Sequence, residues 1–155
     1  MSLYLVQHGE SLPKEINPDR PLSEEGKATV HRIAKTVAEY HIRVSQIIHS
    51  GKTRARQTAE IISMYIKPEL GIRESTGLDP NDDVYSIAST IKGPENFMIV
   101  GHLPFLERLV SFLITGTDKY TIVKFQNGGI VCFYQETEKA IWYIKWMIMP
   151  EKLLT

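Results

Sequence analysis

The chain lacks several features that would assign it to a class at once. It has one cysteine, Cys132, in 155 residues, so no disulfide can form within the chain. No basic segment leading into a long apolar stretch stands at its start, and we therefore expect no signal peptide. No apolar run approaches the ~18 residues that a membrane span needs. These absences favour a protein of the reducing cytoplasm.

An excess of charge of either sign is also missing. The 18 Lys and Arg residues balance 18 Asp and Glu residues, which gives a formal net charge of +0. A nucleic-acid-binding domain carries a surplus of positive charge, and this composition shows none. The lone cysteine and the spacing of the histidines suggest no metal cluster. We therefore expect no metal, no cofactor, no nucleic-acid partner and no membrane contact.

The chain does have the size and apolar content of one packed domain. Hydrophobic residues make up 43% of the sequence, an ordinary share for a globular protein. A chain of 155 residues can bury a core without disulfides or metals. No internal repeat, low-complexity tract or linker divides it. We expect residues 1–155 to form a single domain.

Short apolar runs alternate along the chain with segments of helical periodicity. Ser23 is a good helix N-cap, with Glu24 and Glu25 following in the first turn. The patterns predict strands at 3–6, 45–50 and 97–100, helices at 23–40, 54–66, 83–91 and 102–114, and a loop between the second and third helices. Two further apolar runs, 128–135 and 140–149, flank the polar "ETEK" and predict an antiparallel hairpin.

This alternation predicts an α/β layered fold with a mostly parallel sheet, to which the C-terminal hairpin adds an antiparallel part. Ligands of such sheets bind beyond the carboxyl ends of the strands. Three predicted strands end in polar or small residues: Gln7-His8-Gly9, His49-Ser50-Gly51 and Gly101-His102. We expect the functional site where these three strand ends converge.

Taken singly, the polar residues at these strand ends allow structural as well as functional roles. His8 and His102 could each be a structural hydrogen-bonding group or a ligand contact. Arg54 opens the second predicted helix, where free N–H groups and the positive dipole end favour an anion. Arg56 is explained by a surface ion pair with Glu60 four residues on. Two histidines and an arginine at one edge of a sheet would together make a pocket for a phosphoryl group.

Four motifs in order along the chain carry a resemblance to a known family. They are "QHGE" (7–10), "RPLSEEG" (20–26), "SGKTRARQT" (50–58) and "VGHLP" (100–104). They resemble the Arg-His-Gly-Glu, Arg-Pro-Leu-Thr/Ser-x-x-Gly, Ser-Pro-x-x-Arg-Ala-x-Gln-Thr and Gly-His signatures of the histidine phosphatase superfamily, whose fold is phosphoglycerate-mutase-like. The short chain and the ending "KWMIMP" are similar to the small SixA-type phosphohistidine phosphatases. The resemblance implies a three-layer α/β/α sandwich.

The resemblance also implies a role for each motif residue. His8 would be the nucleophile and would carry a phosphohistidine intermediate. Arg54 would hold the phosphoryl oxygens through its planar fork, and His102 would donate to the same oxygens. Gln7 and Gly9 would lie at the phosphate. The family's reaction requires no metal.

Gln7 departs from the family pattern, which has an arginine at that position. Glutamine keeps an N–H donor but loses the charge and the fork. If two charge-assisted bonds are lost and nothing compensates, the rate could fall by about 10²- to 10³-fold. Lys52, in the loop before the second helix, or Arg20 could supply the missing charge.

A general acid for an alcohol leaving group is not evident in the sequence. Glu74, Asp79, Asp82 and Asp83 in "ESTGLDPNDD" are more typical of turns and helix caps, and Glu10 could cap or pair. An imidazole leaving group depends less on such an acid, because its pKa is near neutral. The lack of an acid favours phosphohistidine over alkyl phosphates.

The sequence therefore predicts a cytoplasmic, metal-independent phosphatase with a histidine nucleophile, acting on phosphohistidine in a phosphorylated protein. One alternative is a phosphomonoesterase for a small phosphorylated metabolite. Another is a weakly active or non-catalytic module that binds phosphate, for which the replacement at Gln7 is the main argument.

Overall fold

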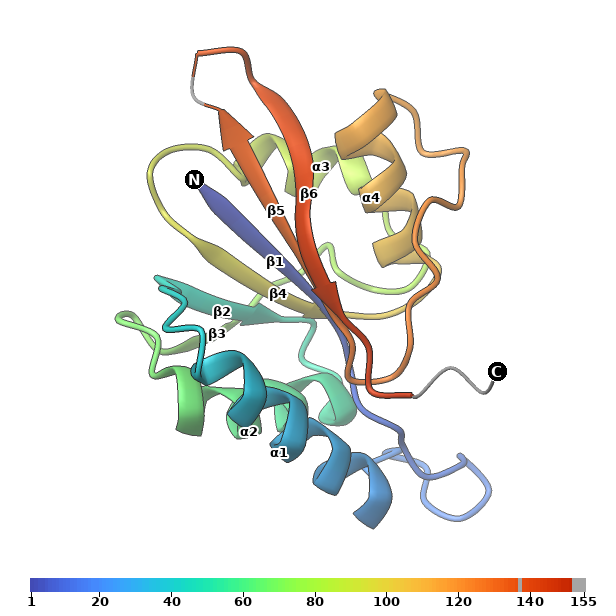
Figure 1. Ribbon diagram of the computed structural model, residues 1–155. Coiled ribbons are helices and arrows are strands. Elements are labelled where there is room, and N and C mark those ends of the chain that lie inside the picture. Colours follow the sequence, from blue (N-terminus) through green and yellow to red (C-terminus); the bar gives the residue numbers. More distant parts are fainter. Residues whose placement is uncertain (137, 152–155) are drawn as a thin grey trace.

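A computed structural model describes residues 1–136 and 138–151 of the chain, and six strands in this part form one sheet (Figure 1). The strands are β1 (Ser2–Gln7), β2 (Gln46–His49), β3 (Ile72–Glu74), β4 (Phe97–Gly101), β5 (Ile130–Glu136) and β6 (Ile141–Ile148). The helices are α1 (Glu24–Ala38), α2 (Thr53–Ile66), α3 (Val84–Thr90) and α4 (Phe105–Thr115). No described helix is long and apolar enough to cross a membrane.

The sheet has the strand order β3-β2-β4-β1-β5-β6. The pairs β1–β4, β4–β2 and β2–β3 are parallel, whereas β5 pairs antiparallel with both β1 and β6. The expected combination of a parallel sheet with an antiparallel C-terminal hairpin is therefore confirmed.

Helices cover both faces of the sheet, with α1 and α2 on one side and α3 and α4 on the other (Figure 1). Alternate residues of β1 point to opposite faces, as the pleat requires. Tyr4 and Val6 belong to the core beneath α1 and α2, and Leu3 and Leu5 to the core beneath α3 and α4. The chain is a three-layer α/β/α sandwich, as expected.

One strand was wrongly predicted as loop. β3 (Ile72–Glu74) pairs with β2 at the edge of the sheet, within the segment taken as a loop between α2 and α3. It has three residues, of which Arg73 and Glu74 are exposed, so it carries no apolar alternation. Periodicity cannot detect a strand this short, because its pairing depends on the neighbour β2.

The parallel pairing brings the functional strand ends together. Gln7 at the end of β1 lies in register with Gly101 at the end of β4, and His49 at the end of β2 lies opposite Val100. The residues that follow these strands therefore leave the sheet on the same side, beyond the carboxyl ends of the parallel strands. His8 is fixed there by its own N–H, which donates to the Gly101 carbonyl at 3.1 Å.

Candidate active site

His8, directly after β1, is held as a neutral imidazole of defined tautomer. Its Nδ1 lies 2.7 Å from the Gly9 carbonyl oxygen, which can only accept, so Nδ1 carries the proton. Nε2 is then unprotonated, and its lone pair accepts an N–H from Arg54 Nε at 3.3 Å. Burial, together with the charges of Arg54 and Arg20, lowers the pKa of His8 to about 4 against the pull of the Gly9 bond. The imidazole is therefore unprotonated at Nε2 near neutral pH.

Thr58 of α2 ties this strand end to the second helix. The Gly9 N–H donates to Thr58 Oγ1 at 3.0 Å, and that hydroxyl donates to the Arg54 carbonyl at 2.8 Å. Thr58 is fully buried. No role was predicted for it, although it ends the "TRARQT" motif, which was the available signal. The contact fixes the His8 loop relative to Arg54.

Gly9 lets the loop after β1 pack closely against α1. A Cβ at this position would lie 2.7 Å from Val30 Cγ2 and 3.2 Å from the Gly26 carbonyl oxygen, both on α1. The lack of a side chain therefore lets α1 approach the loop. Because the Gly9 N–H already donates to Thr58, it is not free for a phosphoryl oxygen. The expected place of Gly9 at the phosphate stays a prediction.

Arg54 and Arg56, neighbours on α2, have different surroundings. The Arg54 side chain is partly buried beside His8, and burial together with the charge of Arg20 lowers its pKa. Arg56 lies at the surface and pairs with Glu60 at 3.2 Å, as its spacing predicted. Only Arg54 faces the strand ends.

His102 follows β4 and lies across the site from His8. It is 2% exposed, and its ring centroid is 5.0 Å from that of His8, with the two planes tilted by 53°. Its Nε2 is 2.6 Å from Ser50 Oγ, while its Nδ1 is buried without a hydrogen-bond partner. Burial first, and then the charges of neighbouring basic residues, lower the pKa of His102 to about 3. His102 is therefore also neutral in the free protein.

Gln7 is hydrogen-bonded to Asn127, a residue that the sequence analysis did not single out. Its Nε2 donates to Asn127 Oδ1 at 2.7 Å, and its Oε1 is buried without a partner. The loop that carries Asn127 is attached to β1, because the Gly128 N–H donates to the Gln7 carbonyl at 2.9 Å. The Gln7 amide is uncharged, and one of the two N–H donors of its Nε2 is engaged with Asn127.

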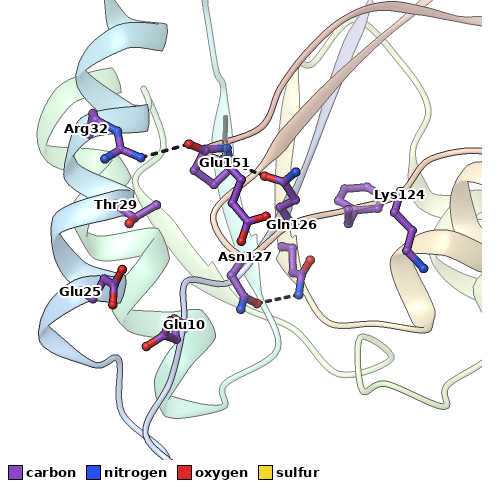
Figure 2. A pocket seen from close by; sticks show the side chains of 11 residues that line it. Glu10, Glu25, Thr29, Arg32, Lys124, Gln126, Asn127 and Glu151 are labelled. Carbon is purple, nitrogen blue, oxygen red and sulfur yellow. Dashed lines mark hydrogen bonds between the residues drawn. The ribbon is translucent and has the colours of Figure 1, made fainter. Parts of the chain in front are cut away.

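A groove of about 610 Å³ begins beside this amide pair (Figure 2). Gln7 and Glu10, which flank the His8-Gly9 segment, both line it. Figure 2 shows α1 side chains along one wall and the loop before β5 along the other. The remaining lining residues are Glu25, Thr29, Arg32, Lys124, Phe125, Gln126, Asn127, Pro150 and Glu151. The groove leads from the strand ends along the surface of α1.

Arg20 is one of the two residues expected to supply an extra charge. Its backbone has a positive φ of 49°, and its guanidinium donates to Ser11 Oγ at 3.1 Å and to the Leu12 carbonyl at 3.4 Å. Its charge contributes to the lowered pKa values of His8, Arg54 and His102. Arg20 therefore acts electrostatically on all three groups.

Lys52, the other residue expected to supply an extra charge, is paired with a carboxylate. Its Nζ lies 3.6 Å from Asp79 Oδ1, so a carboxylate accompanies its charge. Its charge reaches His102, where it contributes to the lowered pKa. The same pair occupies Asp79, one of the carboxylates considered as a general acid.

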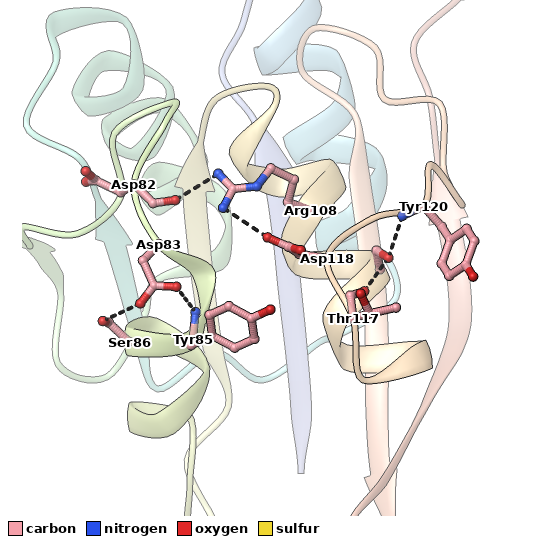
Figure 3. A network of polar contacts seen from close by, with 9 residues as sticks. Asp82, Asp83, Tyr85, Ser86, Arg108, Thr117, Asp118 and Tyr120 are labelled. Atoms are coloured by element: carbon pink, nitrogen blue, oxygen red, sulfur yellow. Dashed lines mark hydrogen bonds and ion pairs between the residues drawn. The ribbon is translucent and has the colours of Figure 1, made fainter.

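Of the other candidate acids, Glu74 ends β3 with its carboxylate beside Gly51, whereas Asp82, Asp83 and Glu10 serve the local structure, as expected for turn and cap residues. Asp83 caps α3 by accepting the Tyr85 N–H at 3.0 Å (Figure 3). Asp82 accepts the Asp79 N–H at 2.8 Å. Glu10 accepts the Ser23 hydroxyl at 2.9 Å, next to the start of α1.

Two comparisons place this geometry among known proteins. The model of the histidine phosphatase superfamily (branch 1) matches residues 3–79. The protein histidine phosphatase SixA, solved with tungstate, superposes with a TM-score of 0.85 at 20% identity, covering 97% of each chain. A candidate phosphohistidine phosphatase SixA from Agrobacterium tumefaciens gives a TM-score of 0.76 at 20% identity, over 95% of this chain and 97% of that one.

The fold is shared with phosphatases of other substrates. A phosphoserine phosphatase from Entamoeba histolytica, solved with phosphoserine, gives a TM-score of 0.73 at 15% identity and covers 99% of each chain. Among curated protein sequences, none matches this chain. With the motif match over residues 3–79 and the same layered fold throughout, the chain belongs to the histidine phosphatase superfamily.

Proposed function

We propose that the chain is a cytoplasmic, metal-independent phosphatase that hydrolyses phosphohistidine on a protein through a covalent intermediate on His8. The observation that carries this proposal is the state of His8. Its proton is on Nδ1, and its unprotonated Nε2 accepts an N–H from the Arg54 side chain at 3.3 Å. A neutral nucleophile next to a cation is what attack on a phosphoryl dianion requires.

In the first step, the Nε2 lone pair of His8 attacks phosphorus. A P–N bond forms to His8, and the bond from phosphorus to the leaving group breaks, with its electron pair going to the leaving atom. The His8 ring becomes positively charged as it gains the phosphoryl group. The Gly9 carbonyl, 2.7 Å from Nδ1, stabilises this charge because the bond to the N–H strengthens.

In the second step, water attacks the same phosphorus and releases inorganic phosphate. The P–N bond to His8 breaks, and its electron pair returns to Nε2. Arg54 moves its N–H donors from Nε2 to the phosphoryl oxygens in both steps, and His102 faces these oxygens from across the site together with the Ser50 hydroxyl to which it is hydrogen-bonded. Because both groups stand at the strand ends before substrate arrives, little reorganisation is needed.

We assign the second positive charge of the site to Arg20. Gln7 cannot supply it, and its amide is engaged with Asn127. Arg20 influences His8, Arg54 and His102 together, whereas Lys52 is paired with Asp79. Arg20 therefore offers the compensation that the replacement at Gln7 demands.

Phosphohistidine is the substrate class that this site favours. Of the carboxylates considered as acids, Glu10, Asp79, Asp82 and Asp83 are engaged in caps, turns or an ion pair. An alcohol leaves poorly without a proton donor, whereas a protonated imidazole leaves as a neutral ring. The similar SixA structure is named as a protein histidine phosphatase, which supports the same choice. The groove beside Gln7 offers room for the chain around a phosphorylated side chain.

The test compares phosphohistidine and phosphoserine peptides of the same sequence, incubated with the protein side by side. We expect inorganic phosphate from the phosphohistidine peptide and little from the other. An acid-labile, alkali-stable adduct on His8 should be trapped by a rapid quench without acid, and His8→Ala should release no phosphate. Full hydrolysis by His8→Ala would show that another group is the nucleophile.

The same experiment separates the alternatives. Preferred release from the phosphoserine peptide, and release from free phosphoserine, would favour a phosphomonoesterase; the similar Entamoeba protein is named as a phosphoserine phosphatase. Binding of both peptides without release would identify a non-catalytic module, for which the neutral Gln7 is the specific observation.

A further inference from the structure

We infer that Ser50 is a positioning residue for His102, which it holds as the tautomer with the proton on Nε2. The inference deepens the proposed function and rests on it, because it concerns the same phosphoryl site. Ser50 is the first residue after β2, and the contact joins two adjacent strand ends.

The contact itself is short and enclosed. Ser50 Oγ lies 2.6 Å from His102 Nε2, within the range of a strong hydrogen bond. His102 is 2% exposed, so water does not replace this partner freely. Among residues 1–136 and 138–151, this is the one side-chain hydrogen bond that orients the His102 ring.

The other ring nitrogen decides which atom carries the proton. Neutral His102 has one N–H, on Nδ1 or on Nε2. If Nδ1 carried it, a buried N–H would have no acceptor, since Nδ1 has no partner in the described structure. Orphaned buried N–H groups are rarer in proteins than unfilled acceptors. The proton therefore belongs on Nε2, where Ser50 Oγ accepts it.

This tautomer also suits the phosphoryl group. A phosphoryl oxygen needs donors, and the Ser50 hydroxyl can donate to it only when its proton is not taken up by His102 Nε2. With the proton on Nε2, the Ser50 oxygen accepts from His102 and its hydroxyl proton is free to donate onward. One donor, the Ser50 hydroxyl, then stands at this corner of the site, while the N–H of His102 is engaged with Ser50.

The backbone around Ser50 holds its side chain in place. The Lys52 N–H lies 3.4 Å from Ser50 Oγ, and the Gly51 N–H donates to His49 Nδ1 at 3.0 Å. Gly51 has a positive φ of 87°, which lets the chain turn sharply between the strand and α2. The hydroxyl is thus presented to His102 by a tight turn.

The test reads the His102 tautomer directly by nitrogen NMR of the imidazole ring in the full-length protein at pH 7. We expect a protonated Nε2 in the wild type and in Ser50→Thr, which keeps the hydroxyl. In Ser50→Ala we expect a mixture of the two tautomers. Ser75→Ala is the matched control, because Ser75 follows the neighbouring strand β3 and donates to the Thr76 carbonyl.

The kinetic readout uses the phosphohistidine peptide. Loss of one hydrogen bond that orders a donor should lower kcat roughly tenfold in Ser50→Ala, with KM nearly unchanged. Ser50→Thr should retain most of the activity, and Ser75→Ala all of it. A wild-type His102 protonated on Nδ1, or a Ser50→Ala variant with unchanged tautomer or unchanged kcat, would overturn the inference. If the wild type hydrolyses nothing, the proposed function fails, while the NMR result still decides how Ser50 holds His102.

Discussion

Lowering the pH from 7 to 5 tests the electrostatic state of the nucleophile. An ordinary histidine has a pKa of 6.5, whereas burial, Arg54 and Arg20 lower the pKa of His8 to about 4. An unperturbed imidazole would be only about 3% neutral at pH 5, while one with a pKa of about 4 stays roughly 90% neutral. The two cases differ by about 30-fold in the concentration of active nucleophile.

We therefore expect the acid limb of kcat/KM, which reports the free enzyme, to fall with a midpoint near 4 and not near 6.5. The direct measurement is an NMR titration of the histidine rings, with the His8 signal identified by its absence in His8→Asn. This measurement needs no substrate, so the acid lability of phosphohistidine does not affect it.

A His8 midpoint near 6.5 would contradict the reasoning, because the ring would then be as well solvated as in an open chain. Arg54→Ala and Arg20→Ala should each raise the midpoint, since each removes a positive charge that disfavours the protonated ring. If the titration midpoint of His8 is unchanged in both variants, burial alone lowers the pKa of His8.

The same shift affects stability. Between pH 6.5 and about 4 the unfolded chain binds a proton at His8 that the folded chain does not. His102, with its pKa lowered to about 3, acts in the same direction. The free energy of unfolding should therefore decrease as the pH falls through this range, as measured by urea unfolding, and the decrease should be smaller in His8→Asn.

The other predictions concern the groups around His8. Arg54→Ala should cost about 2–3 kcal/mol of transition-state stabilisation in kcat/KM, against nearly none for Arg56→Ala, whose side chain pairs at the surface; equal losses would refute the assignment. Arg20→Ala should lower kcat/KM about as much as Arg54→Ala does. Gln7→Arg should lower the rate by crowding a site that already has two cations. A faster Gln7→Arg enzyme would show that Arg20 does not compensate for the missing arginine. Thr58→Val should leave the buried Gly9 N–H unpaired and cost about 1–3 kcal/mol in chemical unfolding, and an unchanged unfolding midpoint would contradict the role given to Thr58.

Local patterns in the sequence were enough to predict most of the fold. The helical stripe of α1, the serine that caps it and the apolar runs of β1 and β4 are properties of neighbouring residues, and the structure confirms them. The Arg56–Glu60 pair was predicted for the same reason, because it spans one turn of a helix. β3 was missed because three residues hold no period and form a strand only beside β2.

The candidate site was predicted in its composition but not in its connections. The order of motifs and the rule of parallel strand ends brought His8, Arg54 and His102 together in the prediction, and the structure places them at one edge. Which nitrogen of His8 is free depends on the Gly9 carbonyl and on burial, and neither can be derived from spacing.

The sequence by itself therefore determined the layered fold, the family motifs and the identity of the residues at the strand ends. Only the tertiary structure decided that Gln7 bonds to Asn127, 120 positions away, and that Ser50 meets His102, 52 positions away. The physical reason is that hydrogen bonding and desolvation act over a few ångströms in space. Residues far apart in the chain reach that distance only after the sheet has formed, so their pairing leaves no periodic trace in the sequence.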